Sequence, residues 1–413
     1  MTEEADLSLE IVILLILGIF MLLFGLLLFK IGTGQLPYNP DSAYGLFLVI
    51  VSFQVITMGK TPFGDLRRSW ALIIIGMCAA ILGMFACFIP GYLTEFVRVL
   101  VGIVLLLGGL TLLMQLFISE RKARMWMKAG GILTQLTIAC SVVYTATVLS
   151  GITALFLGLT TTRQTAILLI IYGSSFFYLS WCIGKVRKSY PLESNTRDID
   201  KSNSKERFGL FREAALPLSQ AILILLGILQ TFLGLLLFPV SLRVIAFSPD
   251  GQLGLLLTVT AIQMMSLGDT PLGQVKRSWA VIIIGLAFAA LGVVSSIVPG
   301  VLTGMIQILL GLLNIIGGAA LLIKRYLPIL QEHRTPPAAP VIVPPTIKKM
   351  MATQTAVNCV QIGFGVSMLV PGLVPGLLMA GILVVNGLLL FMLSSVLRKV
   401  TGIRSSPTSA VSM

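Results

Sequence analysis

Long apolar segments separated by short polar ones recur along the whole chain. Twelve segments hold about 20 mostly apolar residues each, which is the length that an α-helix needs to cross the hydrocarbon core of a membrane. They lie near residues 11–30, 43–59, 70–89, 93–117, 129–150, 164–184, 217–238, 252–268, 279–298, 301–323, 351–370 and 376–397. Because lipid offers no water to satisfy lone backbone groups, these segments are expected to be helices. The pattern predicts an all-α polytopic membrane protein with about twelve transmembrane helices.

The second half of the chain repeats the first at an offset of 209 residues. Residues 59–76, GKTPFGDLRRSWALIIIG, return at 268–285 as GDTPLGQVKRSWAVIIIG. Each half has six predicted helices, so the two copies are expected to be parallel repeats related by an axis along the membrane normal. The predicted parts are a first six-helix repeat at 1–185, a polar cytoplasmic linker at 186–215, a second six-helix repeat at 216–400 and a cytoplasmic tail at 401–413.

Each repeat is predicted to consist of three helical hairpins with glycines at regular intervals. Glycines seven residues apart lie on nearly one face of a helix, where they let neighbouring backbones approach closely. The glycines expected to pack helices are Gly76, Gly83, Gly102, Gly108, Gly285, Gly292, Gly311 and Gly317.

The hairpins at 67–117 and 276–326 resemble the repeat of the HdeD-type small membrane proteins. The likeness lies in a basic and aromatic start, a Gly-x6-Gly helix, a proline at the outer turn, and Gly followed by Gly-Gly in the return helix. A typical member of that family resembles one half of this chain, so the resemblance implies two fused units. It also implies a structural, stress-related or partner-binding role, and it supplies no catalytic residues.

Lys and Arg are unevenly distributed between the two sides of the predicted membrane. Four of the 29 basic residues, Lys30, Arg98, Arg163 and Arg243, fall on one side, and all the others fall on the opposite side. Loops rich in Lys and Arg stay in the cytoplasm, so both termini are expected to be cytoplasmic in a cell (inner) membrane. The net charge of +13 is then explained by topology and by attraction to anionic lipid headgroups, and nucleic-acid binding is not expected.

A repeated loop precedes the third and ninth predicted helices. Thr61 and Thr270 suit helix N-caps, each followed by a proline at the first helical position. The basic residues of the loop would lie at cytoplasmic headgroups, and its tryptophans would anchor the membrane interface. The residues of this repeated cytoplasmic loop motif are Gly59, Thr61, Pro62, Gly64, Asp65, Arg67, Arg68 and Trp70, and Gly268, Thr270, Pro271, Gly273, Lys276, Arg277 and Trp279.

The same loop is similar to the Gly/Asp/basic motif of major facilitator transporters, which also have twelve helices and a long central loop. The departures are that Leu66 directly follows Asp65, where that family has a basic residue, and that Gln274 replaces the aspartate in the second copy. The resemblance keeps a transporter or channel for an uncharged or apolar solute open as an alternative function.

Ionisable residues are almost absent from the centres of the predicted helices. Charged groups inside a membrane usually mark ion or proton paths, so a proton-coupled carrier is disfavoured. Gln54 and Gln263 occupy equivalent places in the two halves. The amides that would either line a solute path or bond neighbouring helices are Gln54, Gln263, Asn314, Asn358, Gln361 and Asn386.

The composition and the missing catalytic patterns exclude most enzyme classes. Apolar residues make up 56% of the 413-residue chain and charged residues 11%, against about 25% charged residues in soluble domains. The five cysteines have no C-x-x-C spacing, and the single His333 lies in the polar, proline-rich cytoplasmic loop 328–346. We predict a non-enzymatic protein with no catalytic residues, cofactor or metal. A third function is a membrane subunit of a larger complex, docked through the Pro-rich loop, which is expected to be extended.

Overall fold

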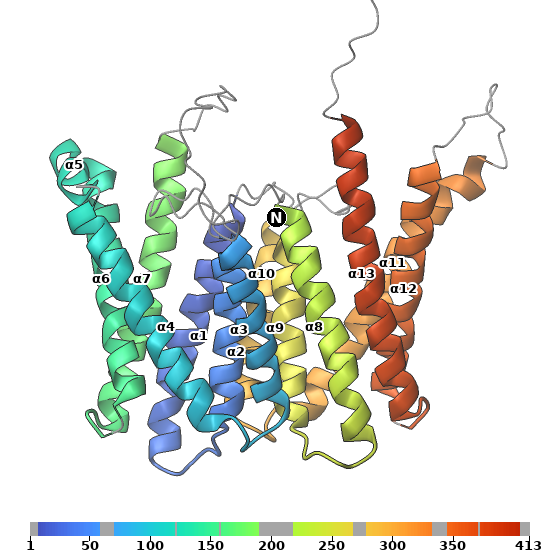
Figure 1. Cartoon of the computed structure of the whole chain (residues 1–413), viewed down its shortest axis with the longest axis horizontal. Helices are drawn as coiled ribbons and strands as arrows, with labels where there is room; N and C mark the ends of the chain where they lie inside the picture. The colour runs from blue at the N-terminus through green and yellow to red at the C-terminus, as the bar shows by residue number, and fades with distance from the viewer. Residues whose placement is uncertain are drawn as a thin grey trace, which may run out of the picture. The chain divides into compact units, whose positions relative to one another are not determined.

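The computed structural model of the chain is all-helical in the part that it describes (Figure 1). The described residues are 7–57, 70–119, 122–156, 158–189, 218–266, 278–332, 345–370 and 372–404. The helices are α1 (Leu9–Gly32), α2 (Pro40–Thr57), α3 (Trp70–Phe88), α4 (Thr94–Met114), the π-helical turn η1 (Gln115–Ser119), α5 (Lys122–Ala129), α6 (Gly131–Leu155), α7 (Thr162–Ser189), α8 (Leu218–Ser241), α9 (Pro249–Ser266), α10 (Trp279–Ile297), α11 (Thr303–Glu332), α12 (Pro345–Leu369) and α13 (Gly376–Arg404). No β-strand occurs within these ranges.

Nine helices among the described residues are long and apolar enough to cross a membrane. They are α1, α3, α4, α6, α7, α8, α10, α11 and α13. These helices fit an integral, multi-pass membrane protein, as the hydropathy pattern predicts. A helix also lies at each of the other predicted segments, as α2, α9 and α12, but their membrane crossing stays a prediction.

The chain divides into two compact units that do not follow the linear halves. The first unit comprises residues 1–215 and 247–303, and the second comprises residues 216–246 and 304–413. The physical reason is that the hairpin of α9 and α10 packs against α1, α2 and α3, which lie in the first quarter of the chain. Compactness therefore groups this hairpin with the first half, whereas the sequence repeat assigns it to the second.

Paired helices build the first unit. α1 packs along α7, α2 along α3, α4 along α6, and α9 along α10, while α6 and α7 run side by side as the teal and green helices of Figure 1. Large side chains such as Phe20, Phe53 and Phe88 are fully buried between these helices. In the second unit, α8 packs along α13, and α13 also contacts α12.

The starts of α2 and α9 are formed in the same way. Asn39 accepts a hydrogen bond from the backbone N–H of Ser42 at 3.2 Å, and Ser248 accepts one from the N–H of Gly251 at 3.3 Å. Each of these capping residues precedes a proline at the first helical position and an aspartate at the second. Proline suits this position because its missing N–H would have no helical partner.

Glycines bring α2 into backbone contact with α3, and α9 into backbone contact with α10. A Cβ atom on Gly83 would lie 2.5 Å from the carbonyl oxygen of Gly45, and a Cβ atom on Gly292 would lie 2.6 Å from that of Gly254. Any larger residue would force the helices apart, so glycine is required by packing at these four positions. Such small-residue contacts hold helices together in lipid, where no hydrophobic drive exists between them.

The other predicted packing glycines divide into two groups. Gly76 and Gly285 face the side chains of Ile56 and Met265, at 2.8 and 2.6 Å from a built Cβ atom. Gly102 and Gly311 face Leu155 and Leu369. By contrast, a Cβ atom on Gly108 or Gly317 would meet nothing within 4 Å. The following glycines, Gly109 and Gly318, make the close contacts in those helices instead.

Candidate functional site

A cavity of about 450 Å³ lies inside the first unit, among α1, α2, α4, α6 and α7. Its volume falls within the range of about 300–1,000 Å³ that is usual for small-molecule sites. One part of its wall is apolar and aromatic, with Phe20, Phe24, Phe47, Leu105 and Leu169 as main contributors. The rest of the wall carries hydroxyl groups, so the cavity has both an apolar and a hydrogen-bonding surface.

Most of the hydroxyl groups come from the chain segments where helices begin or end. Tyr38 lies in the loop between α1 and α2, and its ring stacks on Phe24 with centroids 6.1 Å apart. Burial raises the pKa of Tyr38, with smaller contributions from Tyr44 and Asp41, so its hydroxyl stays protonated. Thr160 and Thr165 share a hydrogen bond of 2.9 Å at the start of α7.

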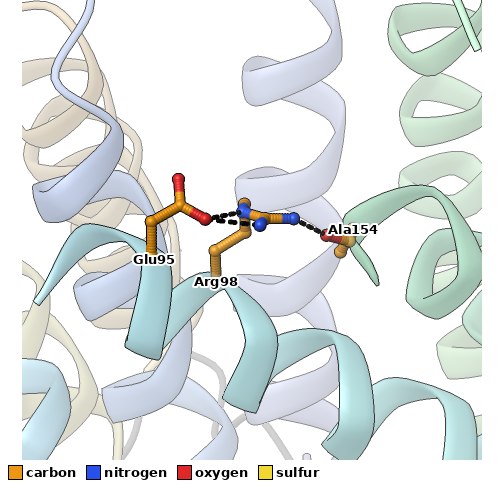
Figure 2. Close-up of polar contacts among 3 residues, drawn as sticks. All are labelled: Glu95, Arg98 and Ala154. Atoms are coloured by element: carbon orange, nitrogen blue, oxygen red, sulfur yellow. Dashed lines mark hydrogen bonds and ion pairs between the residues drawn. The ribbon is translucent and has the colours of Figure 1, made fainter. Parts of the chain in front are cut away.

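A buried arginine, Arg98, contacts Ala154, one of the residues that line this cavity (Figure 2). Arg98 of α4 donates from Nη1 to the carbonyl oxygen of Ala154, a cavity residue, at 2.5 Å. Its Nε and Nη2 donate to Oε2 of Glu95 at 3.2 and 2.5 Å. The side chain of Arg98 is 11% exposed and that of Glu95 is 74% exposed. The exposed carboxylate of Glu95 therefore neutralises the buried guanidinium of Arg98. Without this partner, the buried charge would be costly.

Ser150 of α6 is an unpaired polar group in the cavity wall. The residue is 5% exposed, and its Oγ has no hydrogen-bond partner among the described residues. Its backbone carbonyl accepts a hydrogen bond from Thr153 Oγ1 at 3.0 Å, so only the side-chain hydroxyl is unused. Buried hydroxyl groups normally have a partner, which makes Ser150 the most informative residue of this site.

The six amides proposed from the sequence are not part of the cavity wall. Gln54 and Gln263 are half-buried, and each has an interaction partner. Asn386 of α13 is buried and donates to Gln230 Oε1 of α8 at 2.6 Å. Asn314 donates to the carbonyl of Leu310 in its own helix at 2.8 Å.

The remaining two amides belong to α12. Asn358 is buried, and its backbone carbonyl oxygen lies against Gly318. Gln361 is half-buried.

Most of the repeated cytoplasmic loop lies outside the described residues. Only its last residues are described, and Trp70 and Trp279 are 43% and 45% exposed at the first positions of α3 and α10. The N-cap of α10 is Ser278, whose Oγ accepts from the N–H of Val281 at 3.4 Å. Thr61 and Thr270, the caps expected from sequence, fall within the undescribed segments.

The proline-rich loop is shorter than the sequence pattern indicates. Residues 328–332 belong to α11, and α12 begins at Pro345, which is suited to a first helical position. The expected extended segment 328–346 is therefore wrong at both of its ends, and residues 333–344 lie outside the described part. Likewise, α13 continues to Arg404, into the tail predicted from residue 401.

Sequence reasoning missed the hydroxyl residues of the cavity. Tyr38, Ser150 and Thr162 show no motif, and serine and threonine are common in membrane helices. The signal that could have found them is a departure from the repeat: where the first copy has Tyr38 and Tyr44, the second has Phe247 and Leu253.

The comparisons with known proteins found no relative. No protein-family model, no curated protein and no solved structure matches this chain. Within the described residues, no group of three His, Cys, Asp or Glu side chains is placed to hold a metal ion.

Proposed function

We propose that the chain is a non-enzymatic structural membrane protein built of two parallel six-helix repeats, with a role like that of the HdeD-type proteins. The observation that carries the proposal is a pair of equivalent contacts in the first unit. They join the pair of helices α2 and α3 to the pair α9 and α10. The N–H of Asn39 donates to the carbonyl of Ile297 at 3.0 Å, and the N–H of Ser248 donates to the carbonyl of Phe88 at 2.9 Å.

These two hydrogen bonds are related by the sequence repeat. Ser248 lies 209 residues after Asn39, and Ile297 lies 209 residues after Phe88. Each hairpin therefore offers the same donor and the same acceptor to the other. Reciprocal contacts of this kind are expected where two copies meet about a two-fold axis, which supports parallel repeats.

Contacts between the second and third hairpins of each half support extending the repeat over all six helices. Gly102 contacts Gly151 between α4 and α6, and Gly311 contacts Gly365 between α11 and α12. Gly102 and Gly311 are 209 residues apart, whereas Gly151 and Gly365 are 214 residues apart. An insertion of five residues between the second and third hairpins therefore explains why the fixed offset of 209 loses the match there.

The same relation appears where the first and last helices of each half pack. Gly18 contacts Gly173 between α1 and α7, and Gly227 contacts Gly387 between α8 and α13. The offsets are again 209 and 214 residues. Backbone-to-backbone contact at so many helix crossings favours a rigid scaffold, since packing of small residues is the main cohesive force between helices in lipid.

The scaffold is proposed to sit in the cell (inner) membrane with both termini in the cytoplasm. The surplus of Lys and Arg on the cytoplasmic side supports this orientation and an attraction to anionic lipid headgroups. A partner protein would then meet the basic cytoplasmic face.

A double glycine variant tests the scaffold. Gly83→Leu/Gly292→Leu places side chains against the backbones of α2 and α9, so the melting temperature in detergent should fall by 10 °C or more, roughly, and the function of the protein in cells should be lost with it. The matched control is Gly108→Leu/Gly317→Leu, at glycines of the same repeat where a Cβ atom meets nothing within 4 Å. Unchanged melting and function in the first variant would overturn the proposal.

A second candidate function is transport of an uncharged solute, which the cavity in the first unit favours. Unlike a scaffold role, transport requires the solute to pass through the membrane. Proteoliposomes that admit an uncharged solute such as glycerol faster than empty liposomes would support it, and equal rates would exclude it for that solute.

A further inference from the structure

We infer that the cavity of the first unit binds an uncharged, single-chain lipid with a hydroxyl headgroup, of the monoacylglycerol class. The inference goes beyond the structural role, because a scaffold needs no ligand. It rests on three features of the cavity: its graded polarity, its lack of charge, and the unpaired hydroxyl of Ser150.

The polarity of the wall changes along the helices. Thr162 and Thr165 lie in the first turn of α7, and Leu169 follows one turn deeper. On α1, Gly32 ends the helix beside these threonines, and Phe20 lies 12 residues earlier, about 18 Å along the helix axis at 1.5 Å per residue. The hydroxyls therefore gather at one end of an elongated space whose other end is apolar. This shape fits a single acyl chain below a polar head.

No lining residue of the described cavity is Asp, Glu, Lys, Arg or His. Two charged residues lie close to the cavity without lining it. Arg98 is already engaged by Glu95 and by the carbonyl of Ala154. Asp41, which acts electrostatically on Tyr38, accepts a hydrogen bond from the N–H of Gly91. An anionic or cationic headgroup would therefore enter without a free counter-charge, which is costly at membrane depth. A headgroup that only donates and accepts hydrogen bonds meets no such cost.

Ser150 supplies a hydrogen-bonding group that the protein itself does not use. Its hydroxyl has one donor and two acceptor positions, and it is buried without a partner in the wall. A ligand hydroxyl or ester carbonyl within the cavity would satisfy it.

At five positions the second copy of the repeat lacks the hydroxyl that the first copy places in the cavity wall. The correspondences are Tyr38 with Phe247 and Tyr44 with Leu253 at an offset of 209, and Ser150 with Phe364, Thr162 with Gly376 and Thr165 with Met379 at an offset of 214. Thr153, another lining residue, corresponds to Ser367 at the offset of 214, so the second copy keeps this one hydroxyl and has a less polar counterpart of this end. This comparison rests on the repeat proposed above, whereas the cavity and its unpaired serine do not.

Photo-crosslinking in a bilayer tests the inference. The full-length protein in phosphatidylcholine nanodiscs is irradiated with a monoacylglycerol that carries a diazirine in its chain, and the labelled peptides are mapped. We expect labels on the cavity-lining parts of α1, α4 and α7. Unlabelled monolauroylglycerol should compete at about tenfold lower concentration than dodecanoic acid or dodecane, because only it has an uncharged hydroxyl head.

Variants at Ser150 separate the cavity from the lipid-facing surface. Ser150→Phe, the residue of the second copy, should lower specific labelling about tenfold by filling the space, and Ser150→Ala should lower it about threefold through loss of one hydrogen bond. Leu149→Phe, on the exposed face of the same helix, should leave labelling unchanged.

Labels confined to exposed helix faces would overturn the inference, as would better competition by dodecanoic acid. Equal labelling of Ser150→Ala and the parent protein would overturn it too, even if Ser150→Phe failed to fold. None of these results would change the melting of the glycine variants, so the scaffold and the ligand site can fail independently.

Discussion

Gly83 and Gly45 lie in mutual backbone contact, because a Cβ atom on either would meet the carbonyl oxygen of the other. For Gly83 that distance is 2.5 Å, well inside the contact that a methyl group tolerates. α2 and α3 are thus held at the closest separation that their backbones permit, and the same relation recurs between Gly254 and Gly292 in α9 and α10. The packing of α2 on α3 and of α9 on α10 therefore depends on glycine, because a residue with no side chain lets the two backbones touch.

The contact between the two hairpins should be equally intolerant of added atoms. A Cβ atom on Gly251 of α9 would meet the carbonyl oxygen of Cys87 and the hydroxyl of Ser42. Gly251→Ser makes the copies identical at this position, since Ser42 is its counterpart, but leaves two serines to compete for one space. We expect a loss of about 1–3 kcal/mol in the free energy of unfolding, measured by thermal melting. Gly108→Ser, at an open position, should melt like the parent protein, and equal effects would contradict the proposed packing.

Arg98 offers a test of how a buried cation is tolerated. Its counterpart in the second copy is Gln307, whose Nε2 donates to the carbonyl of Met368 at 2.8 Å, just as Arg98 donates to Ala154. Arg98→Gln should therefore keep that bond and leave stability nearly unchanged. Arg98→Leu should cost about 1–3 kcal/mol by leaving a carbonyl unpaired. Chemical denaturation of both variants measures this, and an Arg98→Gln variant as destabilised as Arg98→Leu would show that the charge itself is needed.

The sequence predicted the helices well because a membrane helix must be apolar over its whole length. Each of the twelve apolar segments contains a helix, although α5 and η1 were not expected. The ends were predicted less well: Pro328 lies inside α11, where the proline-rich composition indicated an extended chain. Pro328 removes one helical hydrogen bond, and the helix continues for only four residues after it, so composition alone could not decide this.

The hydroxyl residues that α6 and α7 contribute to the cavity were not predictable from residue types or from the fixed repeat. Ser150 and Thr162 lie in the third hairpin, where the offset changes from 209 to 214, so a comparison at 209 pairs them with unrelated residues. The location of Arg98 near a helix end was visible in the sequence. Its partners were not, since Ala154 contributes only a backbone carbonyl.

Gln54 and Gln263 distinguish a scaffold from a carrier. Both already have an interaction partner, and polar contacts between membrane helices average well under about 2 kcal/mol. The double variant Gln54→Leu/Gln263→Leu should thus fold, melt within a few degrees of the parent protein, roughly, and retain its function in cells. Loss of function with normal expression and melting would instead place these amides in a solute path.

Membrane topology is testable by labelling introduced cysteines in intact cells. Tyr92 and Val301 are 74% and 57% exposed in the turns after α3 and α10, and the distribution of Lys and Arg predicts that both lie outside the cell. Tyr92→Cys and Val301→Cys should react with an impermeant maleimide, whereas Ser202→Cys and Ala338→Cys should react only after lysis. The parent protein, with its native cysteines, provides the background signal, and the reverse pattern would refute the assigned orientation.

The central claim is that the chain consists of two parallel six-helix repeats. An electron cryo-microscopy structure in nanodiscs tests it most directly, by superposing residues 9–185 on 218–397. The account predicts that all six helices of each half match, with five extra residues before the third hairpin of the second half, about a rotation axis close to the membrane normal. An axis in the membrane plane, or a match limited to the hairpins at 70–114 and 279–323, would contradict it.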